Sequence, residues 1–432
     1  MTDVFADERG HVMLEPDLTE LVDFARRNSP YYRDLYAGVA TDGPIRAEDL
    51  PIVDHIGFWK ANTVQDNRVL TAGHNDGVVF KTGGTTNSPK LTVYTRAELH
   101  AMARLQGDGY AAAGLRTGDR VANLFYAGEL YASFLFNVLC LQETCVPVVH
   151  LPIAGSPSPE VMADLIIEQE ATVLLATPTT ASQVASRLTA RGDSAPAVHL
   201  FLFGGEAFYE DQRRLITEAF PNAVVRSLGY ASVDAGVLAA PVQDEPDARV
   251  HRVHRLHKLV EIVDDETGDP IREPGRPGRL LATDLVRRLM PLIRYPVGDR
   301  AAWVDYDDRR FRLLGRADDG ARVGPVTVYL EDLRVVIEEL AGDQPIAGFQ
   351  AVQRRRDSKD ELVLRIGGQV DDPQPLAEAI SARFEELRPM FGEHVRAGLI
   401  NPLVVEFVPA DMIKVNPRSG KIVRLLDERV AP

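Results

Sequence analysis

Residues 81–90 read Lys81-Thr82-Gly83-Gly84-Thr85-Thr86-Asn87-Ser88-Pro89-Lys90. The glycines of this stretch let the backbone approach a ligand closely, and its hydroxyls and lysines offer hydrogen bonds and positive charge to a phosphate chain. The flanking residues 77–80 and 91–94 are rich in β-branched and aromatic side chains and predict two strands. A Walker-type loop leads into a helix and ends in Gly-Lys-Ser/Thr, whereas this loop leads into a strand and ends in Pro-Lys. By itself the stretch predicts either another kind of nucleotide loop or a polar hairpin turn.

The pattern between residues 95 and 227 alternates between helix-like and strand-like segments. Helices are predicted at 95–112, 129–141, 159–170, 180–189 and 210–220, and strands at 120–125, 145–149, 172–176, 198–203 and 223–227. Repeated units of this length predict an α/β fold with a doubly wound, mostly parallel sheet. Such sheets bind ligands at the carboxyl ends of their strands, which makes 203–206 and 228–232 candidate site segments.

The sequence pattern changes after residue 245, where short strand-like runs alternate with acidic and Gly/Pro turns. This pattern predicts a small antiparallel, β-barrel-like part. Beyond residue 320 we expect a compact α+β unit with a hairpin at 349–366 and a helix at 375–390. The chain is thus predicted to form a large N-terminal domain over 1–315 and a small C-terminal domain over 316–432.

Composition argues against several classes of function. The chain has 432 residues with 63 acidic and 48 basic side chains, a formal charge of −15, and therefore lacks the basic footprint of a nucleic-acid-binding protein. No apolar run is long enough to span a membrane, and the acidic N-terminus has no signal-peptide pattern. We expect a cytoplasmic protein with no membrane partner. Cys140 and Cys145 have no histidine nearby and are predicted to be buried thiols, not zinc ligands.

The stretch at 82–90 resembles the Ser-Gly-Thr-Thr-Gly-x-Pro-Lys signature of the adenylate-forming enzymes. Four later segments resemble further signatures of that family, in the family's order: Leu-Gly-Tyr-Ala-Ser-Val-Asp at 228–234, Ile-Arg-Tyr-Pro-Val-Gly-Asp at 293–299, Leu-Gly-Arg-Ala-Asp-Asp at 314–319, and Asn-Pro-Arg-Ser-Gly-Lys-Ile-Val-Arg at 416–424. Within the family, the chain looks most similar to phenylacetate-CoA ligases and to the adenylating proteins of phenazine-antibiotic biosynthesis. The resemblance implies a large N-terminal domain and a small, mobile C-terminal domain.

The resemblance also implies a reaction in which a carboxylate attacks the α-phosphate of ATP to give an acyl-adenylate and pyrophosphate. The residues it implies for nucleotide binding are Thr82, Gly83, Gly84, Thr85, Thr86, Lys90, Gly204, Gly205, Glu206, Gly229, Tyr230, Ala231, Ser232, Asp299 and Arg316. It implies Lys421 as the catalytic lysine that bridges the carboxylate and the α-phosphate, and Asp318 as the hinge. Asp234 stands where the family carries a magnesium-binding glutamate, with helix N-capping as the competing interpretation.

The acid pocket is predicted from Phe125, Tyr126, Ala127, Gly128 and Tyr131, since small residues between aromatic ones would admit a flat ring. We therefore expect activation of a small aromatic carboxylic acid with ATP and Mg²⁺, in secondary metabolism, followed by transfer to coenzyme A or to an amine, a carrier protein or a reductase. The acceptor stays open because residues 325–329 depart from the family pattern. Two alternatives also stay open: an ATP-dependent diazotase that activates nitrite for an arylamine, and a nucleotide-binding homologue without turnover. A homodimer is a further open expectation.

Overall fold

The computed structural model describes the chain except for residues 1–3, 7–11, 15–16, 41–42, 82–89, 207, 209, 244, 265–266, 317–319, 325, 343, 358, 371, 417–419 and 430–432. The chain forms two compact units built from interleaved segments. Unit 1 comprises Met1–Ala112, Gly128–Cys145 and Leu228–Leu314, and unit 2 comprises Ala113–Ala127, Val146–Ser227 and Gly315–Pro432. The predicted division into domains 1–315 and 316–432 stays a prediction.

Unit 2 contains the parallel sheet that the strand–helix alternation predicts. Its strands are β5 (Arg120–Asn123), β6 (Val149–Leu151), β7 (Val173–Ala176), β8 (Leu200–Phe203) and β9 (Val224–Ser227). They run in the order β6-β5-β7-β8-β9, and every neighbouring pair is parallel. All residues of β7 and β8 are buried, which explains their continuous apolar runs. The strand order reverses direction at β5 and β7, and in sheets of this type such a switch point is where ligands bind.

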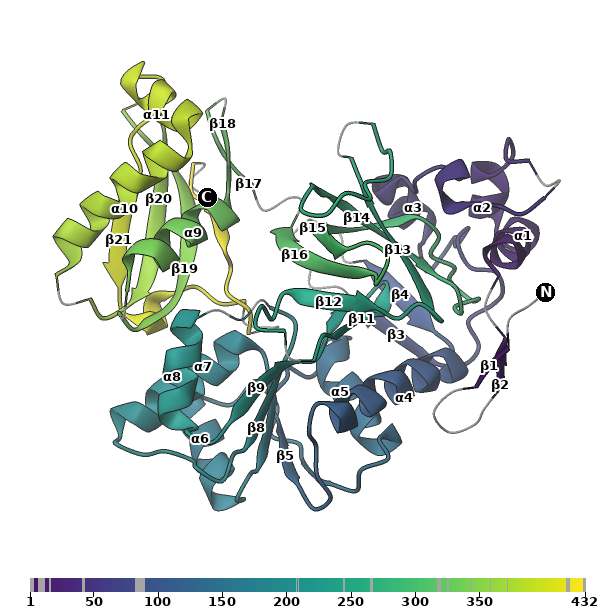
Figure 1. The fold of residues 1–432 in the computed structure, drawn as a ribbon, viewed down its shortest axis with the longest axis horizontal. Helices are drawn as coiled ribbons and strands as arrows, with labels where there is room; N and C mark the ends of the chain where they lie inside the picture. Colours follow the sequence, from purple (N-terminus) through teal and green to yellow (C-terminus); the bar gives the residue numbers. More distant parts are fainter. Residues whose placement is uncertain are drawn as a thin grey trace. The chain divides into compact units, whose positions relative to one another are not determined.

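The helices α6 (Pro159–Glu168), α7 (Pro178–Ala190) and α8 (Glu210–Ala219), which follow β6, β7 and β8 in the chain, pack side by side (Figure 1). α6 begins after Ser158, whose hydroxyl oxygen accepts a hydrogen bond from the Val161 amide. α7 begins after Thr177 in the same way, with Pro178 at its first position.

The remainder of unit 2 is an α+β segment with a core of its own. Its elements are β17 (Gly320–Val323), β18 (Val326–Tyr329), α9 (Leu330–Leu340), β19 (Ile346–Arg356), β20 (Lys359–Gly368), α10 (Pro373–Leu387), α11 (Pro389–Arg396), β21 (Val404–Val408), the 3₁₀ turn η2 (Ala410–Met412) and β22 (Leu425–Asp427). The four-stranded sheet has the order β21-β20-β19-β22, with β19 and β20 antiparallel and the two outer pairs parallel. The predicted hairpin and helix are both present.

Unit 1 begins with β1 (Val4–Ala6), β2 (Val12–Leu14), α1 (Leu18–Asn28), α2 (Pro30–Leu35), η1 (Ala47–Asp49) and α3 (His55–Ala61). β3 (Val78–Lys81) and β4 (Leu91–Tyr94) form the antiparallel hairpin around 82–89, and the helices α4 (Arg96–Ala112) and α5 (Ala132–Glu143) follow in sequence. A second sheet has the order β10-β11-β12-β16-β15-β14-β13. Its strands are β10 (Tyr230–Ser232), β11 (Gly236–Pro241), β12 (Val250–Val253), β13 (Lys258–Val263), β14 (Pro277–Asp284), β15 (Tyr295–Asp305) and β16 (Arg310–Arg316). Its described pairings are antiparallel, as the short strands and turns after residue 245 predict.

The predicted α/β fold class is confirmed, while two local predictions need correction. The helix expected from residue 129 begins at Ala132, because Glu129 and Leu130 have positive φ angles of 47° and 65° that a helix does not accommodate. Cys140 is buried as expected, but Cys145 is exposed at the end of the segment that follows α5. Within the part of the chain that the structure describes, no helix combines the length and apolar character needed to cross a membrane.

Candidate active site

The strands on either side of the glycine–threonine loop are present, whereas the loop itself lies outside the described residues. Thr82, Gly83, Gly84, Thr85 and Thr86 therefore stay predictions as phosphate-binding residues. Lys90, at the exit of the loop, lies next to α3: its Nζ is 2.8 Å from His55 Nε2. The same ammonium lies 6.0 Å from the centre of the Trp59 ring.

His55 and Trp59 were not predicted to belong to the site. They occupy positions i and i+4 of α3 and therefore share one face of this helix. The pairing of an imidazole and an indole on one face was visible in the sequence, but its contact with Lys90 was not. α3 is held at its start by Asp54, whose carboxylate accepts the Ile56 and Gly57 amides at 3.1 and 2.9 Å.

Asp234, the candidate magnesium ligand, is buried in the turn between β10 and β11. Its Oδ2 accepts a hydrogen bond from Tyr295 Oη at 2.6 Å, and its Oδ1 accepts one from Ser232 Oγ at 2.6 Å and one from the Ala235 amide at 3.1 Å. Trp59 Nε1 in turn donates to Tyr295 Oη at 3.0 Å. No helix follows Asp234, because β11 begins at Gly236, so the helix N-capping interpretation is wrong. The contacts orient this carboxylate.

Buried donors hold the same turn by its main-chain carbonyl groups. Tyr94 Oη donates to the Val233 carbonyl at 2.9 Å, Arg287 Nη1 to the Asp234 carbonyl at 2.6 Å, and Lys258 Nζ to the Ala235 carbonyl at 3.1 Å. These hydrogen bonds hold three consecutive main-chain carbonyl groups, so the turn has little freedom to shift.

Arg287 and Lys258 were not predicted to support the site. Arg287 is 2% exposed, and its guanidinium carbon lies 4.0 Å from the centre of the Tyr94 ring. Its Nη2 also donates to Thr92 Oγ1 and to the Val93 carbonyl, at 2.7 and 2.6 Å. Burial lowers the pKa of Lys258, an effect partly offset by its ion pair with Asp284.

Tyr230 and Asp299, both predicted to contact the nucleotide, are in direct contact with each other. Tyr230 is 8% exposed, and its hydroxyl donates to Asp299 Oδ2 at 2.5 Å. Its ring packs edge-on against Phe311, with the ring centres 5.8 Å apart, so it belongs to the core of unit 1. Gly229 precedes it with φ +96°, and a Cβ there would lie 2.4 Å from the Ala239 carbonyl oxygen. Ala231 is exposed and Ser232 is bound to Asp234.

In unit 2, Gly204, Gly205 and Glu206 follow the carboxyl end of β8, as predicted. Glu206 Oε2 accepts hydrogen bonds from the Thr179 amide at 3.1 Å and from the Thr179 hydroxyl at 2.6 Å. These bonds fix the carboxylate at the start of α7. Gly205 has φ +80°, and a Cβ on it would lie 3.3 Å from both Cε and Nζ of Lys421. The predicted catalytic lysine therefore lies against the predicted adenine-binding turn.

Lys421 is exposed, and it lies in a hairpin in which residues 414–416 pair with residues 421–423. The Asn416 amide donates to the Lys421 carbonyl at 2.8 Å, and Val415 pairs with Ile422. Gln350, fully buried on β19, donates to the Lys414 and Val423 carbonyls at 2.9 and 2.6 Å. This support sets the position of the main chain at Lys421.

The residues predicted for the acid pocket differ in burial. Phe125 is buried, Tyr126 is half-buried, and Ala127 and Gly128 are exposed. Burial raises the pKa of Tyr126, and the negative charge of Glu206 adds to the increase, so the phenol keeps its proton. Tyr131 faces Lys81, whose Nζ is 5.8 Å from the ring centre. Gly128 has φ +92°, a value that favours glycine.

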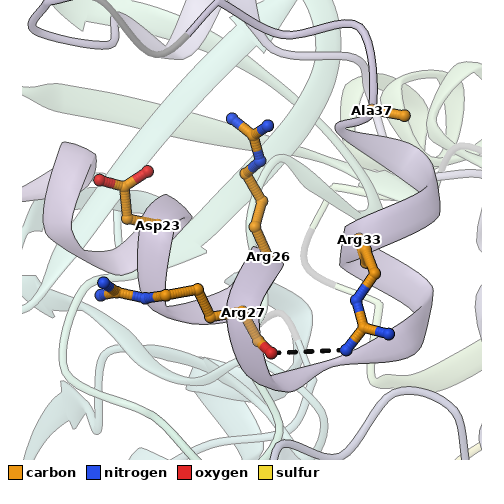
Figure 2. Close-up of a pocket in the computed structure, with 5 residues that line it drawn as sticks. All are labelled: Asp23, Arg26, Arg27, Arg33 and Ala37. Carbon is orange, nitrogen blue, oxygen red and sulfur yellow. Dashed lines mark hydrogen bonds between the residues drawn. The ribbon is translucent and has the colours of Figure 1, made fainter.

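Arg316 ends β16, and Asp318 lies outside the described residues. Figure 2 shows a further hollow, on α1 and α2, that contains none of the predicted site residues; it is lined by Asp23, Arg26, Arg27, Arg33 and Ala37. Arg33 Nη2 donates there to the Arg27 carbonyl at 3.4 Å.

The fold and these motif positions define an adenylate-forming enzyme. Residues 52–284 match the family described as AMP-binding enzyme, and the chain belongs to this family. Among known relatives, the phenylacetate-coenzyme A ligase of Thermus thermophilus is 28% identical, with 98% of this chain and 97% of the relative aligned. The phenylacetate-coenzyme A ligase of Pseudomonas putida is 25% identical over 73% of each chain.

Solved structures show the same fold. 2-Hydroxyisobutyryl-CoA ligase in the postadenylation state superposes with a TM-score of 0.71 at 18% identity, covering 95% of this chain and 88% of that one. An anthranilate CoA ligase in complex with anthranoyl-AMP superposes with a TM-score of 0.56 at 18% identity, covering 80% and 64%. At these identities the likeness concerns the fold.

Proposed function

We propose that this chain activates a small aromatic carboxylic acid with ATP and Mg²⁺ as an acyl-adenylate, and then transfers the acyl group to coenzyme A. The observation that carries this proposal is the contact of Lys421 with the Gly204–Glu206 turn, because it places an ammonium group beside the segment predicted to bind adenine. Attack of a carboxylate on a phosphate requires mainly positioning and stabilisation of negative charge, and a fixed ammonium supplies both.

Several other residues have roles in this proposal. Lys90 and the loop at 82–89 hold the phosphates, and Asp299 binds the ribose hydroxyls. Mg²⁺ would be held by Asp234, whose carboxylate is oriented by Tyr295 and Ser232. One protein carboxylate suits this ion, since Mg²⁺ takes most of its ligands from phosphates and water and supplies charge stabilisation there.

The choice of an aromatic acid rests on the relatives and on the predicted pocket. The curated relatives are phenylacetate-coenzyme A ligases, and one structural neighbour holds anthranoyl-AMP. Tyr126 and Tyr131 follow β5, with the small residues Ala127 and Gly128 between them. Coenzyme A is the proposed acceptor. Part of the departure at 325–329 is explained by packing, because Val326 and Val328 are buried in the C-terminal core, so the departure does not by itself argue against a thioester.

The test is ATP–pyrophosphate exchange with a panel of aryl and short-chain acids, followed by product analysis with and without coenzyme A. We expect exchange with at least one aryl acid and a loss of about a hundredfold or more in Lys421→Ala. The matched control is Lys414→Ala, which removes another exposed lysine from the same hairpin and should retain activity. Exchange that is silent with every acid, or that survives in Lys421→Ala, would contradict the proposal. Nitrogen–nitrogen bond formation with nitrite and an arylamine, without exchange on any carboxylate, would establish the diazotase alternative.

A further inference from the structure

Tyr126 is held between two glycines that come from distant parts of unit 2. A Cβ on Gly155 would lie 2.6 Å from both Cδ2 and Cε2 of the Tyr126 ring. A Cβ on Gly420 would lie 2.0 Å from Cε2, 2.5 Å from Cζ and 2.8 Å from the hydroxyl oxygen of the same ring. Real Cβ atoms do not make contacts this short, so the ring occupies the space that a side chain at either position would need.

The Gly155 side of this arrangement is rigid. The Gly155 amide donates to the Phe125 carbonyl at 3.0 Å, and the Ala154 amide donates to the Asn123 carbonyl at 2.9 Å. The Leu124 amide donates to the Leu175 carbonyl on β7 at 2.8 Å. The main chain that carries Tyr126 is therefore bonded to the parallel sheet at the point where its strand order reverses.

The Gly420 side leads directly to the proposed catalytic lysine. Gly420 is buried and has φ +67°, and its amide donates to the Asn416 carbonyl at 2.8 Å. Lys421 is the next residue, and its side chain extends to Gly205. Any shift of Gly420 away from the ring would therefore move the Lys421 ammonium relative to the Gly204–Glu206 turn.

We propose that Tyr126 is a positioning residue: its ring, backed by Gly155, is the surface on which Gly420 rests, and this contact sets the place of the Lys421 ammonium during adenylate formation. This inference rests on the proposed function of Lys421 and assigns Tyr126 a role other than contact with the acid. The ring provides the effect.

The decisive test is a double-mutant cycle between Tyr126 and Gly420 in the full-length chain, read by ATP–pyrophosphate exchange. Gly420→Ala places a methyl group against the ring and should lower kcat on the order of a hundredfold, the effect of displacing a catalytic group by about 1 Å. Gly192→Ala is the matched control, because Gly192 has φ +72° with no atom within 4 Å of its Cβ position. It carries the same backbone strain without the contact and should keep normal activity.

The cycle gives a clear outcome in either direction. In a Tyr126→Ala background, Gly420→Ala should cost little further activity, because the obstructing ring is gone. Additive losses, or a Gly420→Ala variant as active as Gly192→Ala, would overturn the inference. Tyr126→Ala should lower kcat with little change in the KM of the acid. A rise in KM alone would instead assign Tyr126 to the acid pocket.

Two further measurements separate this inference from the proposed function. Thermal midpoints of the wild type, Tyr126→Ala, Gly420→Ala and the double variant report the Tyr126–Gly420 coupling without any substrate. The inference can therefore be tested even if no acid supports exchange. Transfer to coenzyme A from a chemically prepared acyl-adenylate bypasses the step assigned to Lys421, so Tyr126→Ala should lower this transfer far less than it lowers ATP–pyrophosphate exchange. Equal loss of both half-reactions would show general damage and contradict a role in positioning.

Discussion

Asp234 is the residue whose surroundings bear most directly on metal binding. Its carboxylate accepts hydrogen bonds from Tyr295, Ser232 and the Ala235 amide, and its own carbonyl accepts from Arg287. An aspartate is one methylene shorter than glutamate, so its reach depends on the position of the turn that carries it. The buried donors beneath that turn set this position.

Asp234→Asn tests the metal role at this residue. The amide keeps the size of the side chain but removes the charge that a magnesium ion requires, so we expect a higher Mg²⁺ concentration at half-maximal exchange and a higher KM for ATP. Magnesium and ATP titrations of the two proteins measure this, with the thermal midpoint recorded alongside. An unchanged Mg²⁺ titration with a lower thermal midpoint would show that Asp234 only anchors the turn.

At the scale of elements, β13 and β14 are joined by a buried charge pair at one end of their ladder. Lys258, the first residue of β13, stands directly opposite Asp284, the last residue of β14. Their side chains are 6% and 8% exposed and form an ion pair. Burial alone would raise the pKa of Asp284, but the charge and hydrogen bond of Lys258, together with the charge and main-chain amide of Arg287, outweigh burial and hold that pKa below its ordinary value.

Lys258→Met should destabilise the chain by about 3–5 kcal/mol, because it leaves the Asp284 carboxylate buried without its partner. The double variant Lys258→Met/Asp284→Asn removes both charges and should recover a large part of this loss. Chemical denaturation midpoints of the single and double variants measure the difference. A double variant no more stable than Lys258→Met would mean that the ammonium acts mainly through the Ala235 carbonyl.

At the scale of the whole molecule, buried histidines make stability depend on pH. Burial lowers the pKa of His251 to about 4, against the opposing effects of the Arg249 carbonyl and Asp247. Burial also lowers the pKa of His254 to about 4, and the nearby His257 and Lys258 act in the same direction. In the unfolded chain both side chains return to the ordinary value of 6.5.

Between pH 6.5 and about 4 the unfolded chain therefore binds more protons than the folded chain at these histidines. Their contribution to the free energy of unfolding is complete above pH 6.5, the pKa of histidine in the unfolded chain. It is lost as the pH falls from 6.5 to about 4. His251→Gln should show a shallower fall, because it removes one of the titrating groups, and denaturation midpoints at stepped pH measure the difference. A wild-type minus variant difference that stays constant from pH 6.5 to 4 would contradict this assignment.

The sequence by itself determined the elements and the positions of the motifs. Strands such as 173–176 and 200–203 are buried on both faces and read as unbroken apolar runs, and helices such as α6 and α7 start at a capping hydroxyl followed by proline. Both signals are local, so they can be recognised without knowing what packs against them. The strand–loop–strand form around 82–89, and the placement of Gly204 and Gly205 after a strand end, follow from the same local signals.

Only the tertiary structure decided which distant residues support the candidate site. Arg287 reaches Thr92 across 195 residues of sequence, and Trp59 reaches Tyr295 across 236. Neither pair has a spacing that any periodicity encodes, because the contact depends on how the sheets bring the segments together. For the same reason no local pattern marks the need for glycine at 155 and 420: a side chain there would collide with the Tyr126 ring, which only the folded chain places against them.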